Sequence, residues 1–401
     1  MSKKKIICVV VIFAFIMIIG LIYFFNKNNA QIEKSLVDLG EANLIKDNIE
    51  VYDEVLLSDI VDLNGKKLIN DYKIDTSKVG NIKLDINYYD SDNNERSGFI
   101  DVEIKDLVPP VINIGKSYNH IIDTDFTFEG DILCADNYDK NVRCGILGDY
   151  DLDKLGSNNV KVFATDSSGN RTEKDIVINV IEKPSSANKK REYINLENVI
   201  SNLDDEEIMI DVSKWQGEID WEKVHEAGIN YAMMRLGTQK AIDEESVVDQ
   251  YFERNIKEAR KNGIKVGVYY FSYANDVDDA KIQAEWVVDI LKDYKIDLPV
   301  TFDWECFGYF NQFNLNIHEL NQISKTFYEI IKDNGYDVMQ YGSKNTLLNF
   351  WDTTNIKVWL AHYTEKTDYD KAYVMWQFSD SGKVPGIKDP VDLNYIYLKN
   401  F

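Results

Sequence analysis

Two acidic residues, Asp303 and Glu305, come at the end of the apolar stretch Pro299–Trp304. Residues i and i+2 of a strand face the same way, roughly 7 Å apart along it. Two carboxylates so close in an apolar frame cannot both ionise without a large cost in free energy, so one keeps its proton near neutral pH. Glycoside hydrolysis uses such a pair and needs no cofactor. A D-x-E triplet arises easily by chance in an acidic chain, but its place at the end of a buried strand makes this one a candidate site.

The other residue types exclude several chemistries. The four histidines, His120, His225, His318 and His362, are far apart, and the chain has neither a C-x-x-C nor an H-E-x-x-H motif. The sequence therefore predicts no metal site and no cofactor. With 45 Lys and Arg against 68 Asp and Glu the formal charge is -23. This balance argues against nucleic acid as a partner, because phosphates repel such a surface.

Strands that alternate with helices surround the acidic pair in the C-terminal half. The expected strands are Ile208–Ile210, Tyr231–Leu236, Lys265–Phe271, Pro299–Trp304, Asp337–Tyr341, Val358–Ala361, Tyr373–Phe378 and Val391–Tyr395, and the expected helices lie near 220–227, 244–262, 277–293 and 317–333. This alternation predicts a parallel α/β barrel, and the lack of room for helices after residue 358 favours one without its late helices. An active site in such a barrel lies at the C-terminal strand ends, where Asp211, Ser213, Asp392 and Asn394 also fall.

Two upstream segments repeat each other at an offset of 76 residues, which aligns Asp90 with Asp166 and Ile104 with Val180. Period-2 alternation with polar turns predicts two small β-sandwich modules, at 28–107 and 108–183. The turn at Asp90 lacks the glycine and the closing glutamate of an EF-hand, so we interpret it as a solvated hairpin turn. The polar stretch 184–207 predicts a linker that gains some helix near its end, before a domain at 208–401.

The N-terminus carries 20 consecutive apolar residues, at positions 6–25, directly after Lys3, Lys4 and Lys5. A helix of that length spans roughly 30 Å, about the hydrocarbon thickness of a bilayer. We expect residues 1–27 to form a cytoplasmic tail and a transmembrane anchor in the lipid bilayer, with the rest extracytoplasmic on the cell-wall side of the membrane. A cleaved signal peptide is the alternative. In that compartment Cys134 and Cys144 can form a disulfide, and two free thiols remain the competing interpretation.

Residues 208–401 resemble the glycoside hydrolase family 25, the Chalaropsis-type lysozymes. The resemblance rests on "IDVSKWQGEIDWEKV" (Ile210–Val224), "GVYYFSYA" (Gly267–Ala274), "PVTFDWE" (Pro299–Glu305), "MWQFS" (Met375–Ser379) and "VDLN" (Val391–Asn394), in the order typical of that family. The segment 108–183 is similar to bacterial immunoglobulin-like modules, and 28–107 is a weaker copy. The fold class implied is multidomain: a transmembrane helix, two immunoglobulin-like sandwiches and a modified (β/α)5(β)3 TIM-like barrel.

The family resemblance implies N-acetylmuramidase activity on the glycan strand of peptidoglycan. Carried over by position, Glu305 is the general acid, Asp303 is the nucleophile or the residue that orients the acetamido group, and Asp211 and Asp392 complete an acidic cluster. Hydrogen-bond donors and aromatic faces for sugar binding are expected from Ser213, Trp215, Arg235, Tyr269, Tyr341, Trp359, Trp376, Gln377 and Asn394. We interpret Cys306 as a buried thiol. Trp215 could equally belong to the core, and Arg235 could serve only to pair with a nearby aspartate.

Two other functions stay open at this stage. The barrel could bind glycan without cleaving it, with the β modules as a stalk, although a decayed site would be expected to lose one of the four acidic residues. It could also hydrolyse another glucosamine polymer, such as chitin. Cleavage of purified cell wall separates these hypotheses.

Overall fold

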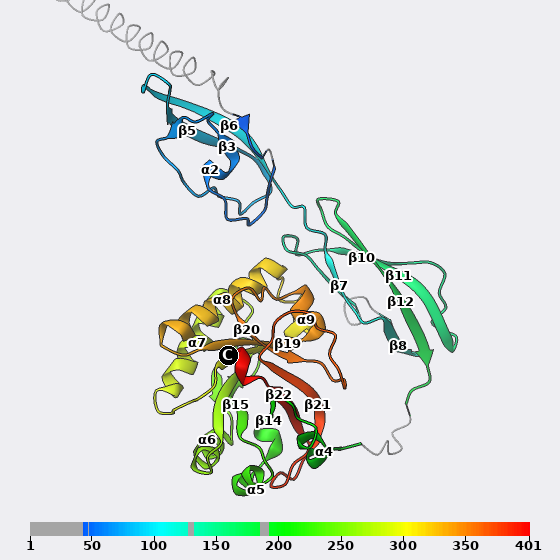
Figure 1. The fold of residues 1–401 in the computed structure, drawn as a ribbon. Coiled ribbons are helices and arrows are strands. Elements are labelled where there is room, and N and C mark those ends of the chain that lie inside the picture. The colour runs from blue at the N-terminus through cyan, green and yellow to red at the C-terminus, as the bar shows by residue number, and fades with distance from the viewer. Residues whose placement is uncertain (1–42, 47, 127–131, 185–191) are drawn as a thin grey trace, which may run out of the picture. The chain divides into compact units, whose positions relative to one another are not determined.

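The computed structural model describes residues 43–46, 48–126, 132–184 and 192–401, drawn in colour in Figure 1. They divide into two compact units, which meet in sequence between Leu107 and Val108. No helix among the described residues is long and apolar enough to cross a membrane. The expected anchor at 6–25 lies outside the described residues.

The first unit is built on a four-stranded sheet. Its elements are β1 (Asn43–Leu44), β2 (Asn48–Glu50), α2 (Leu57–Ile60), β3 (Val61–Asp62), β4 (Lys67–Leu68), β5 (Gly80–Tyr89) and β6 (Glu95–Lys105). The sheet order is β2-β6-β5-β4, and β1 pairs with β3 in a separate two-stranded sheet. Alternate residues of β5, such as Leu84 and Ile86, are buried, which gives the sheet one apolar face.

The second unit begins with a β module that has the same sheet order. Its elements are β7 (Val111–Asn113), β8 (Ser117–Ile121), β9 (Leu133–Ala135), β10 (Arg143–Leu147), β11 (Gly156–Thr165) and β12 (Arg171–Ile181). The sheet is β8-β12-β11-β10, with β7 and β9 paired separately. Gly80 pairs with Ile104 in the first module and Gly156 with Val180 in the second, so the strand register repeats at the offset found in the sequence.

Eight strands of the second unit close into a barrel. They are β14 (Glu207–Val212), β15 (Tyr231–Gln239), β17 (Lys265–Ser272), β18 (Val300–Trp304), β19 (Val338–Ser343), β20 (Lys357–Ala361), β21 (Met375–Lys383) and β22 (Val391–Ile396). The first seven follow one another in parallel, and β22 closes the ring because it pairs antiparallel with both β21 and β14. Closure brings the first and the last strand of the domain together, although they are far apart in sequence.

Helices follow the first five strands of the barrel and no others. They are α5 (Trp221–Glu226), α6 (Phe252–Lys261), α7 (Val277–Leu291), α8 (Ile317–Asp333) and α9 (Lys344–Asn349). Short 3-10 helices follow β14 at Lys214–Gln216, β18 at Cys306–Tyr309 and β22 at Leu398–Asn400. Figure 1 shows α7 and α8 side by side on the outside of the barrel. The start of α8 has a capping box, in which the Asn316 side chain accepts from the Glu319 amide and the Glu319 side chain accepts from the Asn316 amide.

Some expected elements differ from the structure. The helix expected from 244 begins only at Phe252, because Ser246–Val248 forms a short strand, β16, on the edge of β15. Two of its three residues are valines, which favour an extended chain. Within the expected linker, Ile194–Asn195 (β13) pairs with β21 and Leu196–Ile200 (α4) is a short helix. The short helix α9 was not predicted.

The barrel strands alternate between two apolar environments. Met209 of β14 belongs to a cluster inside the barrel with Met233, Met339 and Trp359. Its neighbours Ile208 and Ile210 belong to the larger cluster between the barrel and its helices. Asp211 has the parity of Met209, so it faces the barrel interior. The alternation of each strand therefore decides which of its polar residues can reach the barrel mouth.

Candidate active site

Four carboxyl groups line one cavity at the mouth of the barrel. Asp211 is near the C-terminal end of β14, and Asp303 is near that of β18. Glu305 directly follows β18. Asp392 begins the antiparallel β22 and is the register partner of Asp211, so it lies at the same end of the barrel. The cavity has a volume of about 190 Å³, and all four residues are among those that line it.

A hydrogen-bond network fixes the side of the cavity formed by β14 and β22. The Asn394 amide donates to Asp211 Oδ2 at 2.8 Å. Gln377 Nε2 donates to Asp211 Oδ2 at 3.1 Å and to Asp392 Oδ2 at 3.3 Å. The side-chain oxygen Oε1 of Gln377 accepts from the Tyr341 hydroxyl at 2.9 Å and from the Tyr363 hydroxyl at 3.0 Å. With both ends of its amide engaged, Gln377 holds the two carboxylates in place.

The opposite side of the cavity holds the Asp303 and Glu305 pair. Asp303 is buried, and its Oδ1 atom has no hydrogen-bond partner. Desolvation, followed by the negative charges of Glu305 and Asp211, raises the pKa of Asp303 well above its ordinary value, and Arg235 partly opposes this rise. The Glu305 side chain is exposed at the barrel mouth, but its neighbours still remove part of its water. This desolvation and the charge of Asp211 raise the pKa of Glu305 as well. The cluster therefore keeps protons at a pH where an isolated carboxyl group has lost them.

A buried ion pair supports the cavity wall next to these acids. Arg235 donates from Nη2 to Asp249 Oδ2 at 2.6 Å and from Nε to the same oxygen at 2.8 Å. That oxygen also accepts the Lys214 backbone amide at 3.0 Å, and the Asp249 side chain is only 1% exposed. Asp249 thus orients the cationic Arg235 and anchors the turn that carries Trp215. Arg235 therefore pairs with a nearby aspartate, which is one of the two roles that the sequence suggested for it.

Aromatic side chains form the apolar surfaces of the mouth. Trp359 donates from Nε1 to Asn394 Oδ1 at 2.7 Å and packs edge-on against Tyr341 and Tyr269. Trp215 is 69% exposed, which is unusual for so large an apolar side chain, and it also lines the cavity. Its exposure favours the cleft over the core, because a tryptophan at a wet rim offers a flat apolar face with a polar edge.

The structure places most of the expected site residues together. The cavity is lined by Asp211, Ser213, Trp215, Gln216, Arg235, Tyr269, Phe271, Asp303, Glu305, Tyr341, Trp359, Gln377 and Asp392. Asn394 is fully buried and supports Asp211 from behind. The expectation that Trp376 offers a face to sugar is corrected: it has the opposite parity to Gln377, packs in the outer apolar cluster, and donates to the His362 carbonyl oxygen at 2.8 Å.

Sequence reasoning missed four residues of this region. Gln216 and Phe271 line the cavity, Tyr363 holds Gln377, and Asp249 holds Arg235. Gln216 and Phe271 fall inside the quoted motifs, so reading every inward position of those motifs would have found them. Asp249 lies in a stretch expected to be helical, where nothing pointed to an inward carboxylate.

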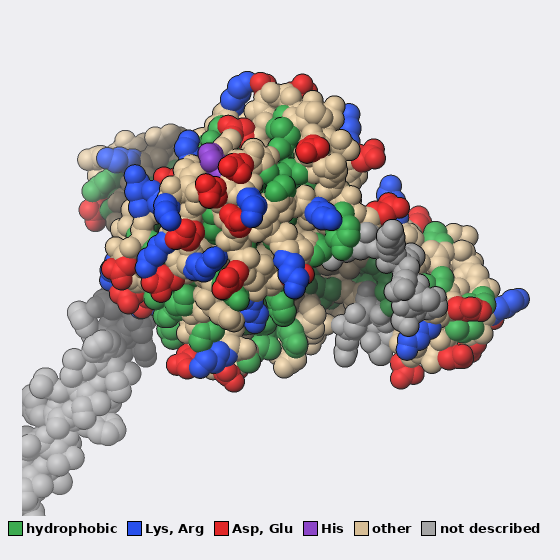
Figure 2. Space-filling view, turned by 90° about the horizontal axis from the view of Figure 1, so that it is seen from below, with side chains coloured by type: hydrophobic (Ala, Val, Ile, Leu, Met, Phe, Trp, Pro, Cys, Tyr) green, Lys and Arg blue, Asp and Glu red, His purple; other side chains and the backbone are tan. Residues whose placement is uncertain are grey.

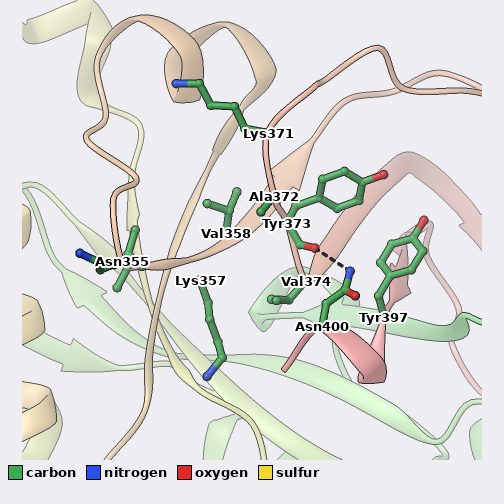
Figure 3. Close-up of a pocket in the computed structure, with 10 residues that line it drawn as sticks. Asn355, Lys357, Val358, Lys371, Ala372, Tyr373, Val374, Tyr397 and Asn400 are labelled. Atoms are coloured by element: carbon green, nitrogen blue, oxygen red, sulfur yellow. Dashed lines mark hydrogen bonds between the residues drawn. The ribbon is translucent and has the colours of Figure 1, made fainter.

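A second pocket lies at the other end of the barrel. Figure 3 shows residues around the start of β20 and the end of β22, with Tyr373 beside Tyr397 and a hydrogen bond from Asn400 Nδ2 to the Tyr373 carbonyl oxygen. Its volume is about 590 Å³, but no carboxylate is among its lining residues. The larger pocket therefore lacks the acid–base groups that the barrel mouth provides.

The barrel and its acidic mouth define a class of enzyme, a glycosidase that works with carboxylates. The sequence profile of the glycosyl hydrolases family 25 matches residues 210–387. The uncharacterized protein YegX of Escherichia coli (strain K12) is 32% identical over 192 residues, which cover 46% of this chain and 67% of YegX. The chain belongs to glycosyl hydrolases family 25, and it is a glycosidase of the lysozyme type.

Two further relatives extend this comparison. An autolytic lysozyme of Clostridium acetobutylicum is 26% identical over 188 residues, 46% of this chain and 54% of that enzyme. The autolysin LytC from Streptococcus pneumoniae, solved in complex with a synthetic peptidoglycan ligand, is 24% identical in sequence, and the match covers 59% of this chain and 56% of that one with a TM-score of 0.43.

Proposed function

We propose that the chain is a membrane-anchored muramidase that hydrolyses the β-1,4 bond between N-acetylmuramic acid and N-acetylglucosamine in peptidoglycan. The observation that carries the proposal is the meeting of Asp211, Asp303, Glu305 and Asp392 around one cavity at the barrel mouth. Membership of a lysozyme family supports the choice of polymer.

Glu305 acts as the general acid in this proposal. It is the solvent-open member of the Asp303 and Glu305 pair, so it can reach the glycosidic oxygen of a bound strand. Desolvation and the charge of Asp211 raise its pKa, so it keeps its proton to a higher pH than an ordinary glutamate. Donation of that proton lets the leaving sugar depart as an alcohol, while positive charge develops on the ring that remains.

Asp303 stabilises that positive charge. Its buried carboxyl group lies beside Glu305, and Oδ1 has no other hydrogen bond to compete for it. It acts either as the nucleophile that forms a glycosyl-enzyme or as the group that orients the substrate's acetamido oxygen for attack. Asp211 and Asp392, held by Gln377, line the same cavity and extend its acidic surface.

The anchor supplies proximity to the substrate. Three lysines followed by the apolar run at 6–25 favour a single membrane span with a cytoplasmic N-terminus. The chain's charge of -23 does not attract an anionic cell wall, and Figure 2 shows acidic and basic side chains intermixed on the face it presents. Tethering, rather than electrostatic attraction, is the proposed means of holding the enzyme near peptidoglycan.

Release of muropeptides from purified cell wall tests the proposal. The wild-type chain is compared with Glu305→Gln and with the matched control Glu329→Gln, whose exposed side chain is on α8. New reducing ends at muramic acid are expected from the wild type and from Glu329→Gln, and not from Glu305→Gln. Binding without cleavage by the wild type, or cleavage of chitin alone, contradicts the proposal.

A further inference from the structure

One buried carboxyl group outside the barrel is only half satisfied. Asp136, which follows β9, is fully buried. Its Oδ1 atom accepts the backbone amides of Tyr138 and Asp139, both at 2.8 Å. Its Oδ2 atom is also buried and has no hydrogen-bond partner. A buried carboxylate oxygen without a partner is costly, so the site calls for either a proton or a cation.

A second carboxylate lies close to the carboxyl group of Asp136. One oxygen atom of Asp166, in the turn between β11 and β12, is within 4.8 Å of a carboxylate oxygen of Asp136. Asp166 is only 8% exposed, and the backbone amide and side-chain amide of Asn170 hold it from the other side, each at 2.8 Å. Among the described residues, no Lys or Arg forms an ion pair with Asp136 or Asp166.

The side chain of Asp139 locks the two turns together. It accepts the backbone amide of Ser167, and its Oδ1 accepts the Ser167 hydroxyl at 2.9 Å. The turn after β9 and the turn after β11 are therefore held at a fixed separation, with the carboxyl groups of Asp136 and Asp166 between them. Burial raises the pKa of Asp136, and the nearby charges of Asp166 and Asp139 add to this rise.

The first β module provides an internal comparison. Asp90 holds the place of Asp166 in the repeat, but its Oδ2 atom accepts from Arg96 Nε at 2.8 Å. The position aligned with Arg96 in the second module is Thr172. At the same offset, Asp136 aligns with the buried Ile60. At these aligned positions, the second module therefore has an additional carboxylate and has threonine in place of arginine.

We propose that Asp136 and Asp166 bind a divalent cation of the calcium class. Hard oxygen ligands on two loops suit Ca²⁺, which accepts irregular geometry and completes its shell with carbonyl groups and water. The sequence predicted no metal site, because the chain lacks the common metal-binding motifs and Asp136 and Asp166 are 30 positions apart. The packing of the two turns, held by Asp139 and Ser167, brings them together.

The bound cation also stabilises the attachment of this module to the barrel. The Asp136 carbonyl oxygen accepts the Ile317 amide at 2.7 Å, and the Tyr138 carbonyl oxygen accepts from the Asn316 side chain at 2.8 Å. Lys140 forms an ion pair of 2.7 Å with Glu319. These contacts satisfy donors at the start of α8 that have no partner within the helix. A cation at Asp136 therefore orders the same turn that docks on α8.

Equilibrium dialysis of the full-length chain against ⁴⁵Ca²⁺, in detergent and after treatment with chelator, tests the site. The wild type is expected to bind Ca²⁺ with a higher melting temperature in CaCl₂ than in EDTA. Asp136→Asn and Asp166→Asn are each expected to weaken binding at least tenfold, and Asp90→Asn, the matched control, to leave it unchanged.

Two outcomes overturn the proposal. One is a wild-type chain that neither binds Ca²⁺ nor changes its melting temperature with it, which points to a protonated Asp136. The other is retention of full affinity in both Asp136→Asn and Asp166→Asn. Circular dichroism of each variant shows that it is folded, and wall cleavage by the barrel, which uses neither residue, separates this result from failure of the proposed function.

Discussion

The barrel mouth and the second β module each hold carboxyl groups that lie close together in buried positions. The surroundings of the two groups differ. At the mouth, Asn394 and Gln377 donate to Asp211, and Arg235 lies near Asp303. In the module, Asp136 Oδ2 has no donor, and no cationic side chain of the described residues pairs with it. The mouth is open to a substrate, whereas the module's acids are enclosed by turns.

The comparison shows two ways in which a protein can stabilise carboxyl groups that lie close together. An acid–base site has to exchange a proton, so amide donors and a guanidinium moderate its charges without removing the raised pKa of Glu305. A structural site has no such need, and the cation proposed for the second module would offset its negative charge. Substitutions that remove a charge, a proton or a cation from one group at a time test this difference.

The largest effect is expected from Glu305→Gln, because the amide cannot donate the proton. General acid catalysis contributes about 10²–10⁴-fold, so kcat should fall by that factor while KM changes little. In the wild type, kcat should decline as pH rises through the Glu305 pKa, which is above 4.5. A pH–rate profile on purified wall measures both. An alkaline limb that survives in Glu305→Gln would assign the proton to another group.

Asp303→Asn should lose at least about 100-fold in kcat, since stabilisation of the transition-state charge is removed. It should also raise the melting temperature at neutral pH. A carboxyl group with a pKa raised on folding favours the folded state while protonated, and that contribution is lost as pH rises from about 4 through the raised value. The stability advantage of Asp303→Asn should therefore grow over this range. Thermal unfolding from pH 4 to 8 measures it, and a variant less stable than wild type at every pH contradicts the assignment.

Asp249→Asn tests the support of the mouth. Removal of one partner of a buried ion pair costs about 3–5 kcal/mol, and Arg235 with the turn bearing Trp215 should lose its orientation. We expect KM to rise more than kcat falls. The matched control is Asp297→Asn, whose pair with Arg260 is more exposed and is expected to contribute at most about 1 kcal/mol. Equal destabilisation of the two variants is the result that rejects a special role for Asp249.

The smallest effect on activity is expected from Cys134→Ser with Cys144→Ser. The structure joins these residues in a bond that closes the loop bearing Asp136. Loss of the link should destabilise the second module by about 3 kcal/mol and weaken the proposed Ca²⁺ binding, because the loop becomes less ordered. Wall cleavage should change by less than about twofold in excess Ca²⁺. Chemical denaturation with and without Ca²⁺ provides the measurement, and unchanged Ca²⁺ affinity breaks the link between loop closure and the site.

Much of the site could be predicted because its residues stand in short motifs on single strands. The Asp303 and Glu305 pair follows from the parity and the apolar character of β18, and the strand ranges expected from sequence lie within two residues of β14, β18 and β22 at most of their ends. The orientation of Trp376 could not be predicted in this way. Its neighbour Gln377 faces inward, but which face of β21 is inward depends on barrel closure.

The amino-acid sequence was enough to identify the candidate site residues, the strands that hold them and the repeat of the β module, because these follow from local periodicity and fixed spacing. Which of these residues meet depends on the tertiary fold. Asp392 is beside Asp211 because β22 pairs with β14, and Asp136 is beside Asp166 because two turns pack together. Such contacts join residues distant in the chain, and the burial that they create raises the pKa of carboxyl groups such as Asp303 and Asp136.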